Sequence, residues 1–152
     1  MDRTNQIKMD FPWKYSSEKY WPFNGMVNDL YRGVQAEENY LVALGLLAYS
    51  EAIGGLLIDL RVMGDGCKCF RAFTEKYVGY KFNHWGQLHD DIRNGLAHQY
   101  FIKNRLGVVL NDPGDRPSGI SENAAGIEIY INTYFQHFVR GLEKFLDEKF
   151  AQ

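Results

Sequence analysis

The sequence predicts a single, mainly helical domain with a small β-hairpin before its last helix. Apolar residues recur at helical spacing in several stretches of the chain. One short stretch near residue 130 instead alternates strictly between apolar and polar residues, which is typical of a strand. The 152 residues, of which 45% are hydrophobic, suit one packed core. We therefore treat residues 1–152 as one domain.

The first stretch, residues 1–23, has no steady period but is rich in aromatic side chains around Pro12 and Pro22. We expect an aromatic N-terminal arm that lies across the core rather than a disordered tail. Residues 1–14 carry charges and lack the apolar centre of a signal peptide, so we expect a cytoplasmic location.

Residues 28–60 predict one long helix or two consecutive helices. Two neighbouring apolar stripes support this reading: Tyr40, Leu44 and Leu47, and Leu41, Ala48 and Ala52. Because apolar residues occupy most faces, we expect a central helix that is packed on several sides. A second subunit is one candidate for such a neighbour. Glu51 and the pair Gly54-Gly55 interrupt the apolar window, which favours a buried core helix over a membrane span.

Two shorter helices follow. The spacing of Phe70, Phe73 and Tyr77 predicts an amphipathic helix that ends near Gly79. The next helix starts near Asn83 and has an inner stripe of apolar residues. That stripe consists of Trp85, Leu88, Ile92 and Leu96, while His89, Arg93 and Tyr100 lie on a different side.

Residues 107–131 predict the hairpin insert. The apolar run 108–110 is followed by turn residues and then by the alternating segment 127–131. Asn132 or Thr133 is the expected N-cap of the last helix. The apolar stripe of that helix is Phe135, Phe138, Leu142, Phe145 and Leu146.

The charge and the cysteines limit how the chain can attract nucleic acid and whether it can form a disulfide. With a formal net charge of −2, the whole chain has no long-range attraction for nucleic acid, so any contact with RNA must come from a local patch. The two cysteines, Cys67 and Cys69, are too close in sequence to form a useful disulfide, and we expect reduced thiols.

The segment 90–100 carries the most specific motif. Four residues separate Arg93 from His98, and the first of them is the polar residue Asn94. Tyr100 follows two positions after His98. This pattern resembles the HEPN superfamily, whose motif is an Arg, four to six residues of which the first is usually polar, and a His. HEPN toxins paired with a minimal nucleotidyltransferase antitoxin also carry the Tyr. The resemblance covers residues 28–152 in outline, and only the motif matches residue by residue.

The resemblance implies a HEPN-like helical bundle that acts as a homodimer, with two copies of the motif facing one cleft. It implies a metal-independent endoribonuclease, in a toxin–antitoxin or other defence system, in which His98 of each subunit serves as base or acid. A nucleotidyltransferase antitoxin is an implied partner, and Tyr100 an implied target for it. The hairpin and the aromatic arm depart from the simplest members, which leaves the subfamily open.

The residue types suit this chemistry. A histidine such as His98 transfers protons near neutral pH, and the planar fork of Arg93 donates two hydrogen bonds to a phosphate. Asn94 would orient the phosphate or the imidazole through its amide. Five positions on a helix correspond to a rotation of roughly 140°, so Arg93 must reach round or the helix must distort at Gly95. Glu51, an acid in an apolar helix, needs a partner, for which we name Arg93.

Other interpretations remain open. Arg93 can be a structural cation paired with Glu51 or Asp90, and His98 a core histidine. The whole domain can be a HEPN module without catalysis that binds RNA, a nucleotide or a protein. The set Cys67, Cys69, His84 and His89 resembles a zinc site, but its cysteines are closer than usual. We expect no metal and no cofactor.

Overall fold

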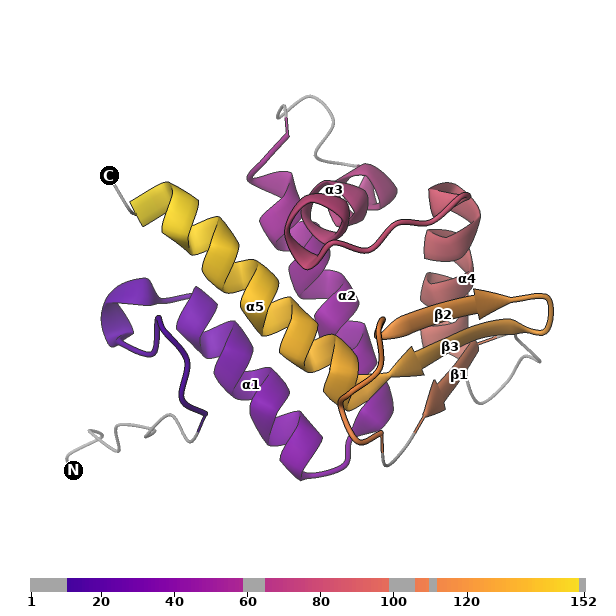
Figure 1. The fold of residues 1–152 in the computed structure, drawn as a ribbon, viewed down its shortest axis with the longest axis horizontal. Helices are drawn as coiled ribbons and strands as arrows, with labels where there is room; N and C mark the ends of the chain where they lie inside the picture. Colours follow the sequence, from indigo (N-terminus) through magenta and orange to yellow (C-terminus); the bar gives the residue numbers. More distant parts are fainter. Residues whose placement is uncertain (1–10, 59–64, 99–105, 110–111, 151–152) are drawn as a thin grey trace.

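The computed structural model describes residues 11–58, 65–98, 106–109 and 112–150 (Figure 1). Within these residues the fold is mainly helical, as predicted. The helices in the first two thirds of the chain are α1 (Phe23–Gln35), α2 (Asn39–Gly55), α3 (Gly66–Phe73), which continues into the π-helical turn η3 (Thr74–Val78), and α4 (Trp85–His98). The remaining elements are strands β1 (Leu106–Val109), β2 (Ile120–Asn123) and β3 (Gly126–Tyr130), followed by helix α5 (Ile131–Phe150).

The helices α1 and α5 lie side by side in front of α2, and α4 stands beside the sheet (Figure 1). The helical region predicted over 28–60 is therefore two helices, separated at Glu37, whose φ of 58° is left-handed and cannot continue a helix. None of the helices in the described ranges has the length and hydropathy that a bilayer span requires.

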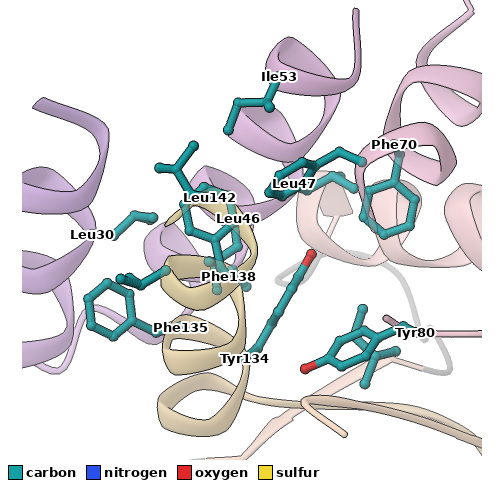
Figure 2. Close-up of a cluster of buried hydrophobic side chains, with 14 of the residues drawn as sticks. Leu30, Leu46, Leu47, Ile53, Phe70, Tyr80, Tyr134, Phe135, Phe138 and Leu142 are labelled. Carbon is teal, nitrogen blue, oxygen red and sulfur yellow. The ribbon is translucent and has the colours of Figure 1, made fainter. Parts of the chain in front are cut away.

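The centre of the molecule is a cluster of apolar side chains between α5, α2 and α3 (Figure 2). Phe138 of α5 is fully buried, and its ring centroid lies 5.6 Å from that of Phe73. Every member of the stripe predicted for the last helix is buried: Phe135, Phe138, Leu142, Phe145 and Leu146. The helical period alone was sufficient to orient this helix.

The described part of the N-terminal arm, residues 11–22, packs on the helices. It contains a short 3-10 turn, η1 (Glu18–Tyr20). Trp13 and Tyr15 are buried in the core cluster, and the Tyr15 hydroxyl donates a hydrogen bond to Asp147 of α5. Lys14 Nζ lies 2.5 Å from the same carboxylate. These contacts attach the arm to the C-terminal half of α5, while residues 1–10 lie outside the described ranges.

The sheet differs from the predicted hairpin. Strand β3 lies in the middle and pairs in parallel with β1 and antiparallel with β2, so the true hairpin is β2–β3. The predicted pairing of 108–110 with 127–131 as a hairpin is therefore wrong in direction, and Ile131 begins α5 instead of ending the strand. The sequence pattern missed β2 because, of its four residues, only Ile120 is buried and apolar, which leaves no alternation to detect.

The start of α5 is held by a residue from the preceding loop. Oδ2 of Asp112 accepts a hydrogen bond from the backbone N–H of Thr133 (2.7 Å), and Nδ2 of Asn132 donates to the Asp112 carbonyl (2.6 Å). The prediction that Asn132 or Thr133 is the N-cap was wrong, because the helix already begins at Ile131. Burial opposes ionisation of Asp112, but hydrogen bonds from Thr133 and Gly114 outweigh it and lower the pKa of the carboxyl.

Tyr80 joins the segment before α4 to α5. Its hydroxyl accepts a hydrogen bond from the N–H of Gly119 (2.7 Å) and lies 2.6 Å from Nδ1 of His137. Burial raises the pKa of Tyr80, so the hydroxyl keeps its proton. The tautomer of His137 decides which of the two groups donates in this bond.

Candidate functional site on helix α4

Helix α4 is fixed by one buried stripe, which is the stripe predicted from the sequence: Trp85, Leu88, Ile92 and Leu96. Its packing against the sheet is close at Gly95, where a Cβ atom would lie 2.5 Å from the Cβ of Leu106 on β1. A larger residue at position 95 would force the helix away from the sheet. The glycine inside the motif thus serves packing.

Two residues of the motif, Arg93 and Asn94, lie outside this stripe. Arg93 and Asn94 are both exposed. The backbone is α-helical through Gly95 to His98, so the distortion considered at Gly95 is not present. The side chain of His98 and all of Tyr100 lie outside the described part of the structure. The distance between Arg93 and His98 therefore stays a prediction.

Glu51 of α2 has a different partner from the one expected. Its Oε1 lies 2.6 Å from Nε2 of His89, one helical turn before Arg93 on α4. The His89 side chain is 3% exposed and that of Glu51 24%. With Glu51 ionised, the ring nitrogen donates to the carboxylate, and this bond links α2 to α4.

The surroundings of this pair are tightly packed. The His89 ring lies 5.6 Å from that of Phe70, centroid to centroid. A Cβ on Gly66, at the start of α3, would lie 3.3 Å from the Glu51 carboxylate. Three helices therefore meet at Glu51. His89 was not among the predicted site residues; its spacing of four from Arg93, which places both on one side of α4, is the signal that could have identified it.

The structural role considered for Arg93 is not seen. None of the ion pairs between described side chains includes Arg93, so neither Glu51 nor Asp90 neutralises it. Asp90 is exposed, and Asp91 accepts a hydrogen bond from Gln87. Among the described residues, the guanidinium of Arg93 therefore has no carboxylate partner.

The cysteines beside the site are not activated. Burial raises the pKa of the Cys67 thiol, and the carboxylate of Asp65 raises it further. Burial, followed by Glu51, does the same at Cys69. Both thiols therefore stay protonated near neutral pH. Among the described residues, no group of three or more His, Cys, Asp or Glu side chains is arranged to hold a metal ion, so the zinc set does not assemble there.

A pocket lies elsewhere, between the arm, α1 and α5. It has a volume of about 400 Å³, and its lining includes Phe11, Tyr31, Phe135 and Arg140. None of its lining residues belongs to the motif. We therefore place the candidate site on α4.

No family model, curated protein or solved structure matches this chain. The resemblance to HEPN domains consequently depends on the motif residues and on their helical setting.

Proposed function

We propose that this chain is a metal-independent endoribonuclease of the HEPN type that acts as a homodimer. The observation that carries the proposal is the exposure of Arg93 and Asn94 on α4 with Arg93 in no ion pair with a described residue. Arg93 has no ion-pair partner among the described residues, and α4 is packed from behind by its apolar stripe. An exposed guanidinium in this position is suited to bind an outside anion.

The proposed reaction uses the RNA's own 2′-hydroxyl. Its oxygen attacks the adjacent phosphorus and forms a new O–P bond, while the bond from phosphorus to the 5′-oxygen breaks. In one subunit the base His98 takes the 2′ proton, and in the other the acid His98 protonates the 5′-oxygen. Arg93 neutralises the charge on the phosphoryl oxygens, and Asn94 orients the phosphate.

In this proposal Glu51 acts indirectly. Because its carboxylate holds His89, and His89 lies one turn before Arg93, the pair fixes the position of α4 relative to α2. A shift of α4 would move the phosphate-binding side chain away from its partner subunit's motif. Glu51 is thus a positioning residue.

The biological setting follows the same resemblance. We place the enzyme in the cytoplasm, in a toxin–antitoxin or defence system, with a nucleotidyltransferase antitoxin that modifies Tyr100 as the expected partner. Modification of a tyrosine two residues after His98 would add a bulky anion beside the phosphate site and block RNA.

A second candidate is a non-catalytic module of the same type that binds RNA, a nucleotide or a protein. The acidic pair Asp90 and Asp91 favours it, because two carboxylates within a turn of Arg93 weaken the local attraction for a polyanion. Such a module would still use Arg93 but would leave RNA intact.

The test is cleavage of single-stranded and structured RNA in the presence of EDTA. We expect products with cyclic-phosphate ends and a loss of about 10²–10⁴ in rate for His98→Ala. His84→Ala, which changes an exposed histidine outside the motif, should retain full activity. Unchanged cleavage by a folded His98→Ala protein would refute the mechanism, whereas binding of RNA without any cleavage would favour the module.

A further inference from the structure

One face of α2 is apolar and exposed. Leu41, Leu44 and Leu56 are 63%, 45% and 62% exposed, and Ala48 and Ala52 between them are exposed as well. Spacings of three and four place these five residues in one row, which we call the α2 face. From Asn39 to Gly55 the helix carries one charged residue, Glu51. A helix that is apolar on all sides is normally covered on all sides, so the α2 face needs a neighbour.

A groove adjoins this face on the side of α1. It has a volume of about 250 Å³ and is lined by Leu30 and Gly33 of α1 and by Leu41 and Gly45 of α2, among others. The two helices are close there, because a Cβ on Gly45 would lie 2.9 Å from Leu30 Cδ2. The apolar surface therefore extends beyond one row of side chains.

The charges around the α2 face exclude two kinds of occupant. Asp29 and Glu38 line the groove, and Glu37 is exposed beside it. Acids at the rim repel both an anionic lipid surface and the RNA backbone. A protein surface that is itself apolar fits this face, and a second copy of the chain offers one.

We propose that the α2 face packs antiparallel against the same face of a second copy, with Ala48 on the two-fold axis. In that register residue i lies opposite residue 96 − i. Leu44 then faces Ala52, and Leu41 lies opposite Gly55, so these two leucines meet small residues, while Leu56 lies opposite Tyr40. The antiparallel direction also keeps the acidic residues Glu37 and Glu38 of the two copies apart, by about the 25 Å length of a 17-residue helix.

The area of the contact indicates how far it extends. A helix of about 25 Å that packs at 8–10 Å from its neighbour presents roughly 250 Å² to it. A stable interface needs about 800 Å² on each partner, so the contact must include a further surface. Glu51 follows Ala48 by three positions, on the side away from the α1 groove, and binds His89 of α4. The exposed side of α4 is therefore the surface next to the α2 face.

This arrangement deepens the proposed function and rests on its dimer. The two-fold axis of an antiparallel face-to-face pair lies in the interface, perpendicular to both helices. Rotation about this axis leaves the direction along the axis unchanged. Because α4 flanks α2 in that direction, both copies of α4 lie on the same side of the dimer. A parallel pair would put them on opposite sides. The antiparallel register thus brings Arg93 of both subunits toward one cleft.

The test compares Ala48 with Ala125, an exposed alanine in the β2–β3 turn. In light scattering at micromolar concentration we expect twice 17.6 kDa for the wild type and for Ala125→Glu, and 17.6 kDa for Ala48→Glu with an unchanged circular dichroism spectrum. Ala48→Cys treated with diamide should form a disulfide-linked dimer, and neither Ala125→Cys nor the wild type should do so.

A monomeric wild type would overturn the proposal, as would an Ala48→Glu protein that stays dimeric or an Ala48→Cys protein that does not cross-link. These results do not depend on RNA. If the dimer behaves as proposed but the cross-linked protein leaves RNA intact, the interface stands and the proposed ribonuclease function fails.

Discussion

Helices α4 and α5 both bury an apolar stripe, but their polar side chains differ in what they contact. On α5, His137 binds Tyr80, Asp147 binds Lys14 and Tyr15, and the first turn is held by Asp112. Among the described side chains of α4, His89 has this kind of contact between helices, while Arg93 and Asn94 are exposed. The polar groups of α5 connect segments that are distant in the chain.

This difference has a physical consequence. A polar group that satisfies a distant partner contributes to stability, because its removal leaves the other group unpaired. An exposed group with no such partner contributes little to stability. Substitutions of the buried or paired residues of α5 should therefore change stability, and substitutions on the outer side of α4 should change activity only.

The largest expected effect is at the centre of the α5 stripe. Phe138→Ala leaves a cavity beside Phe73, and we expect a loss of about 3–5 kcal/mol in the free energy of unfolding, measured with urea. Asn94→Ala on the exposed side of α4 should change it by about 0.5 kcal/mol or less. Similar losses for the two variants would break the comparison.

The next effect is at the Tyr80 link. Tyr80→Phe leaves the Gly119 N–H and His137 Nδ1 without their partner, and we expect a loss of about 1–3 kcal/mol in urea denaturation. Tyr31→Phe is the control, because the Tyr31 hydroxyl forms no hydrogen bond with a described residue and its ring contacts would remain. Equal stability of the two variants would show that the link contributes nothing.

A smaller effect is expected at the start of α5. Asp112→Ala removes the acceptor of the Thr133 N–H and should cost about 1–2 kcal/mol at pH 7. Because the folded-state pKa of Asp112 is lowered, its contribution is present above the unfolded-state pKa and is lost as the pH falls through the folded value. The difference between wild type and variant should shrink below about pH 4. A constant difference would assign the loss to packing.

The smallest effect on α5 concerns pH near neutrality. Burial, and then the charge of Arg140, lower the pKa of His137, so the unfolded chain binds a proton at a higher pH than the folded one does. Stability should fall as the pH drops through about 6.5 toward the folded value. His137→Gln can still accept from Tyr80, and its melting temperature should fall less between pH 8 and pH 5.5. Parallel curves would contradict this.

The two helices also differ in how much the sequence could predict. The stripes of α4 and α5 follow from the helical period alone, because burial of one face imposes it. Three other features depend on residues that meet only after folding. They are the partner of Glu51, the cap at Asp112 and the parallel pairing of β1 with β3. Strand β2 has too few buried residues to leave a pattern. The motif at Arg93 was found because its residues are neighbours in the sequence.

The most direct test of the account compares two exposed arginines, Arg93 on α4 and Arg140 on α5. We expect Arg93→Ala and Arg140→Ala to unfold within about 0.5 kcal/mol of the wild type. RNA cleavage should fall by about 10²–10³ for Arg93→Ala and stay unchanged for Arg140→Ala. Arg93→Lys should also be impaired, because it keeps the charge but loses the bidentate fork. Full cleavage by a folded Arg93→Ala protein, or equal losses at both positions, would contradict the account.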